Sequence, residues 1–139
     1  MKFSSNASLI FVAAIHLAAC GAKTSDEEQV RALIDSAEAA AESRDASDVL
    51  ELVADDYADS NGFDKTQLRN FLRGYFLAHP KLEVVVNIES LEFPVDGLAQ
   101  AVVGVATVEL ADPDAQRLNL EFRRVEGQWR LSRADRARR

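Results

Sequence analysis

The sequence has few of the residues that build metal centres, disulfides and cofactor sites. It contains 1 cysteine and 2 histidines among 139 residues. A single cysteine cannot form an internal disulfide, and these residues leave no set of nitrogen and sulfur ligands for zinc. The Gly-x-Ser-x-Gly elbow, the phosphate-binding glycine loop and the dinucleotide-binding fingerprint are also missing. We therefore expect no metal and no cofactor.

The chain also lacks an apolar run long enough to span a bilayer. Its N-terminal apolar stretch, residues 9–19, has 11 residues, whereas a spanning helix needs about 20. The net charge of -7 argues against nucleic acid as a partner. A length of 139 residues fits one small domain with one core, which excludes enzymes that need a separate cofactor domain.

The N-terminal segment is typical of a secretory signal peptide, because the positive Lys2 precedes the apolar stretch. The stretch ends in Leu17-Ala18-Ala19-Cys20, which resembles the lipobox of bacterial lipoproteins. The resemblance implies that residues 1–19 are removed and that Cys20 receives diacylglycerol and a fatty acid such as palmitate. It also explains why the single cysteine directly follows a small-residue cleavage signal. The alternative is an ordinary signal peptide with a coincidental cysteine.

The same resemblance predicts where the protein is located. In lipoproteins, a glycine after the lipidated cysteine, here Gly21, implies no retention in the inner membrane. We therefore expect a lipid-anchored protein of the bacterial cell envelope, on the outer membrane and facing the periplasm. Residues 20–25 would form the lipidated tether, residues 26–135 the domain and residues 136–139 a basic tail.

Three helices are predicted in the first half of the domain. Ser25-Asp26-Glu27-Glu28 has the capping-box pattern, and apolar residues follow it at helical spacing. Asp45 or Ser47 would cap a short second helix. The third helix begins after Asp64 and ends at His79-Pro80, because a residue that precedes proline is disfavoured in the helical conformation. Its apolar face consists of Leu68, Phe71, Leu72, Tyr75 and Phe76.

Four strands are predicted after the third helix. Residues 81–93 alternate between apolar and polar, and Asp96-Gly97 marks a turn into a strand over residues 98–110. Gly104 is expected to form a bulge or bend in that strand, and Asp112-Pro113-Asp114 to turn the chain. Strands over 117–125 and 128–134 follow. The pattern predicts an α+β fold, with three N-terminal helices packed on a curved, four-stranded antiparallel sheet.

This order of elements resembles the nuclear-transport-factor-2-like superfamily, which includes ketosteroid isomerases and polyketide cyclases. The residues that carry the resemblance are Tyr75-Phe76-Leu77-Ala78-His79, at the end of the third helix, and the hairpin Glu126-Gly127-Gln128-Trp129-Arg130-Leu131. The resemblance covers about residues 26–135. It implies a cone-shaped α+β barrel with a cavity between the helices and the concave face of the sheet. A cystatin-like wrap is the alternative fold.

A binding module of this fold would hold a small apolar ligand in that cavity. The side chains expected to line it are Tyr57, Tyr75, His79 and Trp129, a few polar groups in an apolar setting. Packing of three phenylalanines into the cone would instead fill the cavity. These are Phe71, Phe76 and Phe122.

Asp56 and His79 are the candidates for acid–base catalysis. Histidine has an unperturbed pKa of about 6.5 and can act as a general base with a carboxylate. In the last turn of a helix, however, it also interacts favourably with the helix dipole. The ketosteroid isomerase chemistry needs carboxyl groups in an apolar site, whereas Asp56 lies in a polar stretch. The sequence therefore favours a non-catalytic module for ligand binding or protein interaction, with an isomerase, cyclase or dehydratase as the alternative.

The charge is distributed unevenly along the chain. Between Cys20 and Asp64 there are 13 acidic and 3 basic residues, whereas arginines gather at the C-terminus. Such a cluster could bind an anionic partner, such as lipid phosphates or an acidic protein surface. The alternative is a solvated tail that balances the acidic helices. An envelope protein or a second copy of the chain would dock on the exposed sheet face. The arginines are Arg130, Arg133, Arg136, Arg138 and Arg139.

Overall fold

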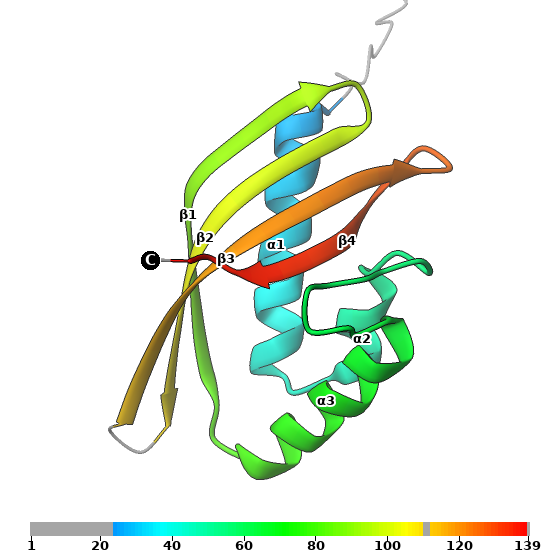
Figure 1. Cartoon of the computed structure of the whole chain (residues 1–139). Helices are drawn as coiled ribbons and strands as arrows, with labels where there is room; N and C mark the ends of the chain where they lie inside the picture. The colour runs from blue at the N-terminus through cyan, green and yellow to red at the C-terminus, as the bar shows by residue number, and fades with distance from the viewer. Residues whose placement is uncertain (1–23, 110–111, 139) are drawn as a thin grey trace, which may run out of the picture.

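The computed structural model describes residues 24–109 and 112–138. The predicted signal peptide, the predicted lipidation site Cys20 and the last residue, Arg139, lie outside the described residues. Three helices precede four strands (Figure 1). They are α1 (Asp26–Glu42), α2 (Ala46–Glu51), α3 (Lys65–Ala78), β1 (Glu83–Val95), β2 (Leu98–Glu109), β3 (Asp112–Val125) and β4 (Gln128–Arg136).

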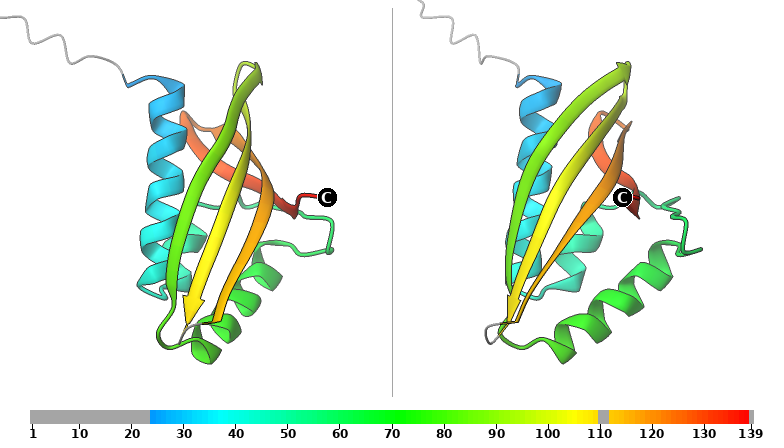
Figure 2. Two further views of the ribbon diagram at one scale, coloured as in Figure 1. Left: turned by 90° about the vertical axis from the view of Figure 1, so that its left-hand side faces the viewer. Right: turned by 60° about the vertical axis from the view of Figure 1, so that its left-hand side comes forward.

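The four strands form one antiparallel sheet in the order β1-β2-β3-β4. The sheet is bent and twisted, and the helices lie on its concave side (Figures 1 and 2). This arrangement confirms the predicted α+β fold with three helices on a curved sheet. Among the described residues, no helix combines the length and the apolar character that crossing a membrane requires.

Two expected details of the strands are wrong. Asp112-Pro113-Asp114 belongs to β3, where proline is tolerated because β4 pairs with β3 only from Leu118 onward. Gly104 pairs regularly with both neighbouring strands, and the register shifts lie elsewhere in the sheet. Near Gly104, on the outer face of the sheet, Arg117 of β3 binds Glu89 of β1 at 2.9 Å. A Cβ atom at Gly104 would lie 3.5 Å from the Glu89 carboxylate.

The helix ends follow the predicted capping pattern. Ser25 and Glu28 form a capping box at α1, and Asp45 caps α2. Asp64 caps α3, where Gln67 completes a second capping box. These side chains satisfy backbone N–H groups that have no partner within the helix.

Two apolar clusters make up the core. Under α1, three residues at helical spacing pack against β2, β3 and β4; they are Val30, Leu33 and Ile34. Phe122 and Trp129 belong to this cluster and are 1% and 4% exposed. The second cluster joins α3 to β1 and consists of Phe76, Leu82 and Val84. Two of the three phenylalanines that would fill the cone in the alternative to an open cavity, Phe76 and Phe122, are therefore buried.

Main-chain groups at both edges of the sheet have partners outside it. On β4, the Leu131 N–H donates to the Leu52 carbonyl at 2.9 Å, and the Leu131 carbonyl accepts from the Ala54 N–H at 2.9 Å. On β1, the Val86 N–H donates to the Glu38 carboxylate at 3.3 Å. The segment after α2 and a side chain of α1 thus cover parts of the two edge strands.

Candidate functional site

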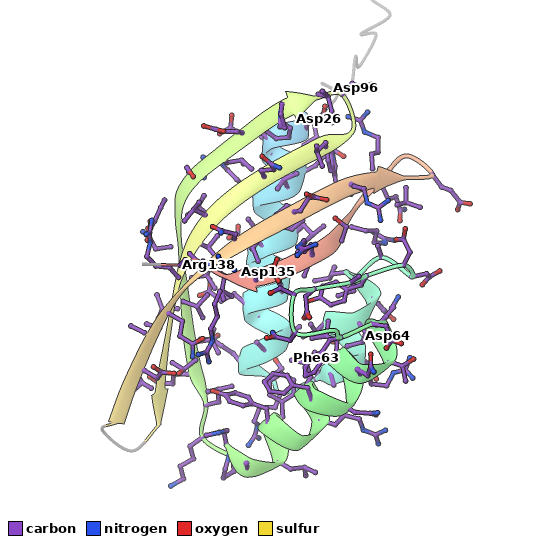
Figure 3. All side chains as sticks on the ribbon, in the orientation of Figure 1. Asp26, Phe63, Asp64, Asp96, Asp135 and Arg138 are labelled. Atoms are coloured by element: carbon purple, nitrogen blue, oxygen red, sulfur yellow. The ribbon has the colours of Figure 1, made fainter. Side chains whose placement is uncertain are left out.

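Four aromatic side chains form a row along α3, which we call the aromatic row: Phe63, Phe71, Tyr75 and His79. Neighbouring ring centroids lie 5.9, 5.9 and 4.2 Å apart in that order. Three of the residues are four positions apart in the sequence, so one turn of helix separates each from the next. The row begins just before the N-terminus of α3, where Phe63 and Asp64 are labelled in Figure 3.

One member of the aromatic row contacts the core between α3 and the sheet. Tyr75 packs against the second core cluster together with Leu72. Phe71, one turn earlier in the row, remains 51% exposed, although Phe76 in the next turn is 7% exposed. Phe71 is therefore not buried in the way that the alternative of a filled cavity requires. The helix thus presents a row of aromatic rings that the protein covers only in part.

Tyr57 does not join this row. It is 2% exposed, and its hydroxyl donates to Asp59 Oδ2 at 3.0 Å. The other oxygen of Asp59 accepts from the backbone N–H groups of Asn61 and Phe63 at 2.9 and 3.1 Å. Tyr57 thus anchors the segment between α2 and α3.

The environment of Tyr57 predicts how the stability of the folded protein changes with pH. Burial raises the pKa of its phenol above the usual value of about 10, and the Asp59 carboxylate adds to the shift. Because the folded-state pKa exceeds the unfolded one, this stabilisation is complete below about pH 10 and is lost as the pH rises further. Tyr57→Phe should therefore show a smaller loss of stability than the parent between about pH 9 and about pH 11, measured by urea unfolding. Tyr75→Phe is the control, and an equal loss in parent and Tyr57→Phe would contradict the argument.

Trp129 lies beside the N-terminal end of α1. Its Nε1 donates to Asp26 Oδ1 at 3.2 Å, and the other oxygen of Asp26 binds Arg124 at 2.6 Å. Arg124 also binds Asp96 at 3.0 Å, and its guanidinium carbon lies 4.9 Å from the centroid of the Trp129 ring. Phe93 meets that ring edge-on at 5.9 Å. We call this group the N-terminal clamp, because it ties the start of α1 to both hairpins; Asp26 and Asp96 are labelled together in Figure 3.

The structure therefore brings together only two of the four expected cavity residues. Tyr75 and His79 stack on each other, whereas Tyr57 belongs to the loop after α2 and Trp129 to the N-terminal clamp. Phe63 and Phe71 are the members of the row that were not expected to contact a ligand. The four-residue spacing of positions 71, 75 and 79 was the sequence signal for Phe71.

Asp56 does not have the environment of a catalytic acid in an apolar site. Its carboxylate binds Arg123 at 2.6 Å, and its side chain is 68% exposed. The hydrogen bond from Arg123 lowers the pKa of this carboxyl below its usual value. A paired, solvated carboxylate of this kind is ionised at neutral pH and is a weak base.

Two of the C-terminal arginines have hydrogen-bond or ion-pair partners within the domain. Arg130 donates to the Trp129 carbonyl at 3.1 Å, and Arg133 pairs with Asp135. Arg136 and Arg138 are exposed and have no ion pair among the described residues. Within the same ranges, no group of three or more histidine, cysteine, aspartate or glutamate side chains is placed to hold a metal ion.

Two hollows are open to solvent. One, of about 450 Å³, lies over β1, β2 and β3 and is lined by polar side chains such as Ser90, Gln100 and Asn119. The other, of about 690 Å³, lies between the C-terminal end of α1 and α3. Three arginines line it, Arg44, Arg69 and Arg73. The sequence analysis did not connect them, because position 44 lies far from the other two along the chain.

These features define a small α+β domain with a half-covered aromatic row under a curved sheet. No family model matches the sequence, and no curated protein does. Solved structures share the fold, and each identity is below 25%, so the likeness shows the fold alone. Together with the architecture, they show that the chain has the nuclear-transport-factor-2-like fold.

Three solved structures illustrate the likeness. A protein of unknown function with a cystatin-like fold from Nostoc punctiforme has a TM-score of 0.71 and 12% identity, over 84% of this chain and 79% of its own. A nuclear-transport-factor-2-like protein of unknown function from Shewanella oneidensis has a TM-score of 0.66 and 14% identity, over 81% of this chain and 98% of its own. A protein from Xanthomonas campestris is named as a calcium/calmodulin-dependent protein kinase II association domain. It has a TM-score of 0.66 and 19% identity, over 81% of this chain and 87% of its own.

Proposed function

We propose that this chain is a lipid-anchored protein of the bacterial envelope whose domain is a non-catalytic binding module. Its anchor would be Cys20, and its ligand a small apolar molecule that packs on the aromatic row. The observation that carries the ligand proposal is Phe71, which is 51% exposed within a stacked row.

The exposed ring surface is large enough to contribute to binding. A phenylalanine side chain buries on the order of 200 Å² when fully covered. Covering the exposed half of Phe71 would therefore stabilise a complex by about 2–3 kcal/mol, at about 25 cal/mol per Å². Tyr75 and His79 continue the same surface and add a hydroxyl and a ring nitrogen that can orient a ligand.

The acid–base chemistry of the enzyme alternative finds less support in this site. Asp56 is held in an ion pair with Arg123 and belongs to the loop after α2. His79 stacks on Tyr75 at 4.2 Å and is half-buried at the end of α3. The two candidates therefore have different partners, Arg123 for Asp56 and Tyr75 for His79.

Native mass spectrometry of the protein purified from its own envelope tests the proposal. We expect a retained small molecule in the parent protein and its loss in Phe71→Ala. The matched control is Val95→Ala, which removes an apolar side chain that is 61% exposed at the end of β1 and should leave the ligand in place. An empty parent protein, or equal loss in both variants, would contradict the proposal.

Self-association is the second candidate, and one exposed residue favours it. Val85, on the outer face of β1, is 57% exposed, and two of the solved structures with this fold are named as association domains. The parent protein would then carry no ligand and sediment as a dimer, and Val85→Glu would sediment as a monomer. This result would support self-association instead of ligand binding as the function.

A further inference from the structure

We infer that the hollow between the C-terminal end of α1 and α3 binds a soluble phosphate monoester whose organic part is apolar. This hollow, which we call the arginine hollow, has a volume of about 690 Å³. It is separate from the aromatic row, and the inference does not depend on what that row binds. The side chains that the argument uses are Arg44, Arg69, Arg73, Leu77 and Pro80.

Within the described part of the chain, two of the arginines make no pairing interaction that would stabilise the helix on which they lie. Arg69 and Arg73 lie one turn apart on α3, and like charges at this spacing destabilise a helix by a few tenths of a kcal/mol. Neither has an ion pair or a hydrogen bond among the described residues. The chain has 23 acidic residues against 16 basic ones, so carboxylates are plentiful elsewhere. The one carboxylate that lines the hollow, Asp45, caps α2 through the Asp48 N–H at 3.0 Å.

The third arginine occupies a strained position. α1 ends in a Schellman motif, in which the Arg44 N–H donates to Ala41 and the Asp45 N–H to Ala40, both at 3.0 Å. Arg44 has a φ of 56°, the left-handed conformation that usually belongs to glycine at this position and is costly for other residues. Its guanidinium also donates to the Pro80 carbonyl at the wall of the hollow. A strained residue of this kind points to a function for its side chain.

The lining suits a phosphate ester better than a simple carboxylate. Each guanidinium can donate two parallel hydrogen bonds to oxygens of a phosphate, and the hydroxyls of Ser43 and Ser47 also line the hollow. A phosphate monoester offers three terminal oxygens and a charge near -2 at neutral pH, whereas a carboxylate offers two oxygens and one charge. Leu77, which is 85% exposed, and Pro80 provide apolar surface beside the arginines.

The position of the hollow favours a soluble ester over a lipid headgroup. It lies at the C-terminal end of α1, whereas the tether enters at the N-terminal end (Figure 1). The 17 residues of α1 separate the two ends by about 25 Å, at 1.5 Å per residue. The preference for a soluble ester rests on the anchor proposed above: a headgroup in a membrane held at the N-terminal end of α1 would lie at a distance of about 25 Å from the hollow.

Isothermal titration calorimetry tests the inference. The protein would be expressed from its full-length chain, purified in a non-ionic detergent and titrated with phenyl phosphate, inorganic phosphate and benzoate. We expect saturable binding that is tightest for phenyl phosphate. The double variant Arg69→Gln/Arg73→Gln should weaken it at least tenfold. The matched control, Arg136→Gln/Arg138→Gln, makes the same change in net charge with two exposed arginines of the C-terminal end, and it should leave binding unchanged.

A second variant separates binding from folding. Arg44→Gly removes both the guanidinium and the strain at the positive φ, so we expect weaker phenyl phosphate binding and an unchanged or higher melting temperature. The inference is wrong if no saturable heat is seen, if both double variants weaken binding equally, or if benzoate binds as tightly as phenyl phosphate. It is also wrong if the protein binds phosphatidic acid vesicles but not phenyl phosphate.

Discussion

Replacing Trp129 with alanine is expected to lower the free energy of unfolding by about 3–5 kcal/mol, the usual range for a large aromatic side chain in a core. Trp129 is 4% exposed and belongs to the cluster beneath α1. The variant would also remove the hydrogen bond to Asp26 and the ring under Arg124. Small domains have about 5–15 kcal/mol of stability in total, so the loss would be visible directly in urea unfolding followed by circular dichroism.

Two further variants show which part of the Trp129 side chain is responsible for the lost stability. Trp129→Phe keeps most of the apolar volume but cannot donate to Asp26, so it should lose about 1–2 kcal/mol. Val125→Ala changes a side chain that is 42% exposed near the same hairpin, and surface substitutions of this kind usually stay within about 0.5 kcal/mol. If Trp129→Ala lost no more than Val125→Ala, the N-terminal clamp would not be part of the stabilising core.

Replacing Cys20 with serine is expected to release the protein from membranes completely. The proposed anchor consists of acyl chains on Cys20, each worth about 0.8 kcal/mol per buried methylene group. Serine has no thiol to accept the diacylglycerol, so none of this energy remains. Cell fractionation measures the release, and metabolic labelling with palmitate measures the loss of the lipid.

A substitution beside Cys20 provides the control for that experiment. Gly21→Asp keeps the lipidated cysteine but introduces the residue that lipoproteins use for inner-membrane retention. It should therefore leave the protein membrane-bound and move it from the outer-membrane fraction to the inner one. Continued membrane attachment of Cys20→Ser would show that the chain is not anchored through this residue.

The fold was largely predictable because its signals are local. Capping residues such as Ser25 and Asp64, the helical spacing of apolar residues and the strand alternation all act within a few positions of the chain. The contacts across the sheet were not predictable in the same way. The ion pair between Glu89 and Arg117, for example, joins residues of two different strands.

The candidate site was predictable only where its residues lie on one helix. Tyr75 and His79 share a face of α3, and they do stack. Tyr57 and Trp129 were grouped with them because aromatic residues suit a cavity, but their surroundings depend on long-range packing. The arginine hollow was missed for the same reason, because the turn after α1 has to reach α3 before Arg44 can lie near Arg69.

The covered edges of the sheet would matter if the proposed anchor concentrates the protein on a membrane. Proteins tethered to one membrane collide with their own copies often, and an open edge strand can pair with the edge of a neighbour and start aggregation. Here the backbone around Leu131 on β4 is already paired with residues 52 and 54, and the Val86 N–H of β1 with Glu38. The domain can therefore be crowded on a surface while these edge groups stay closed to β-sheet polymerisation.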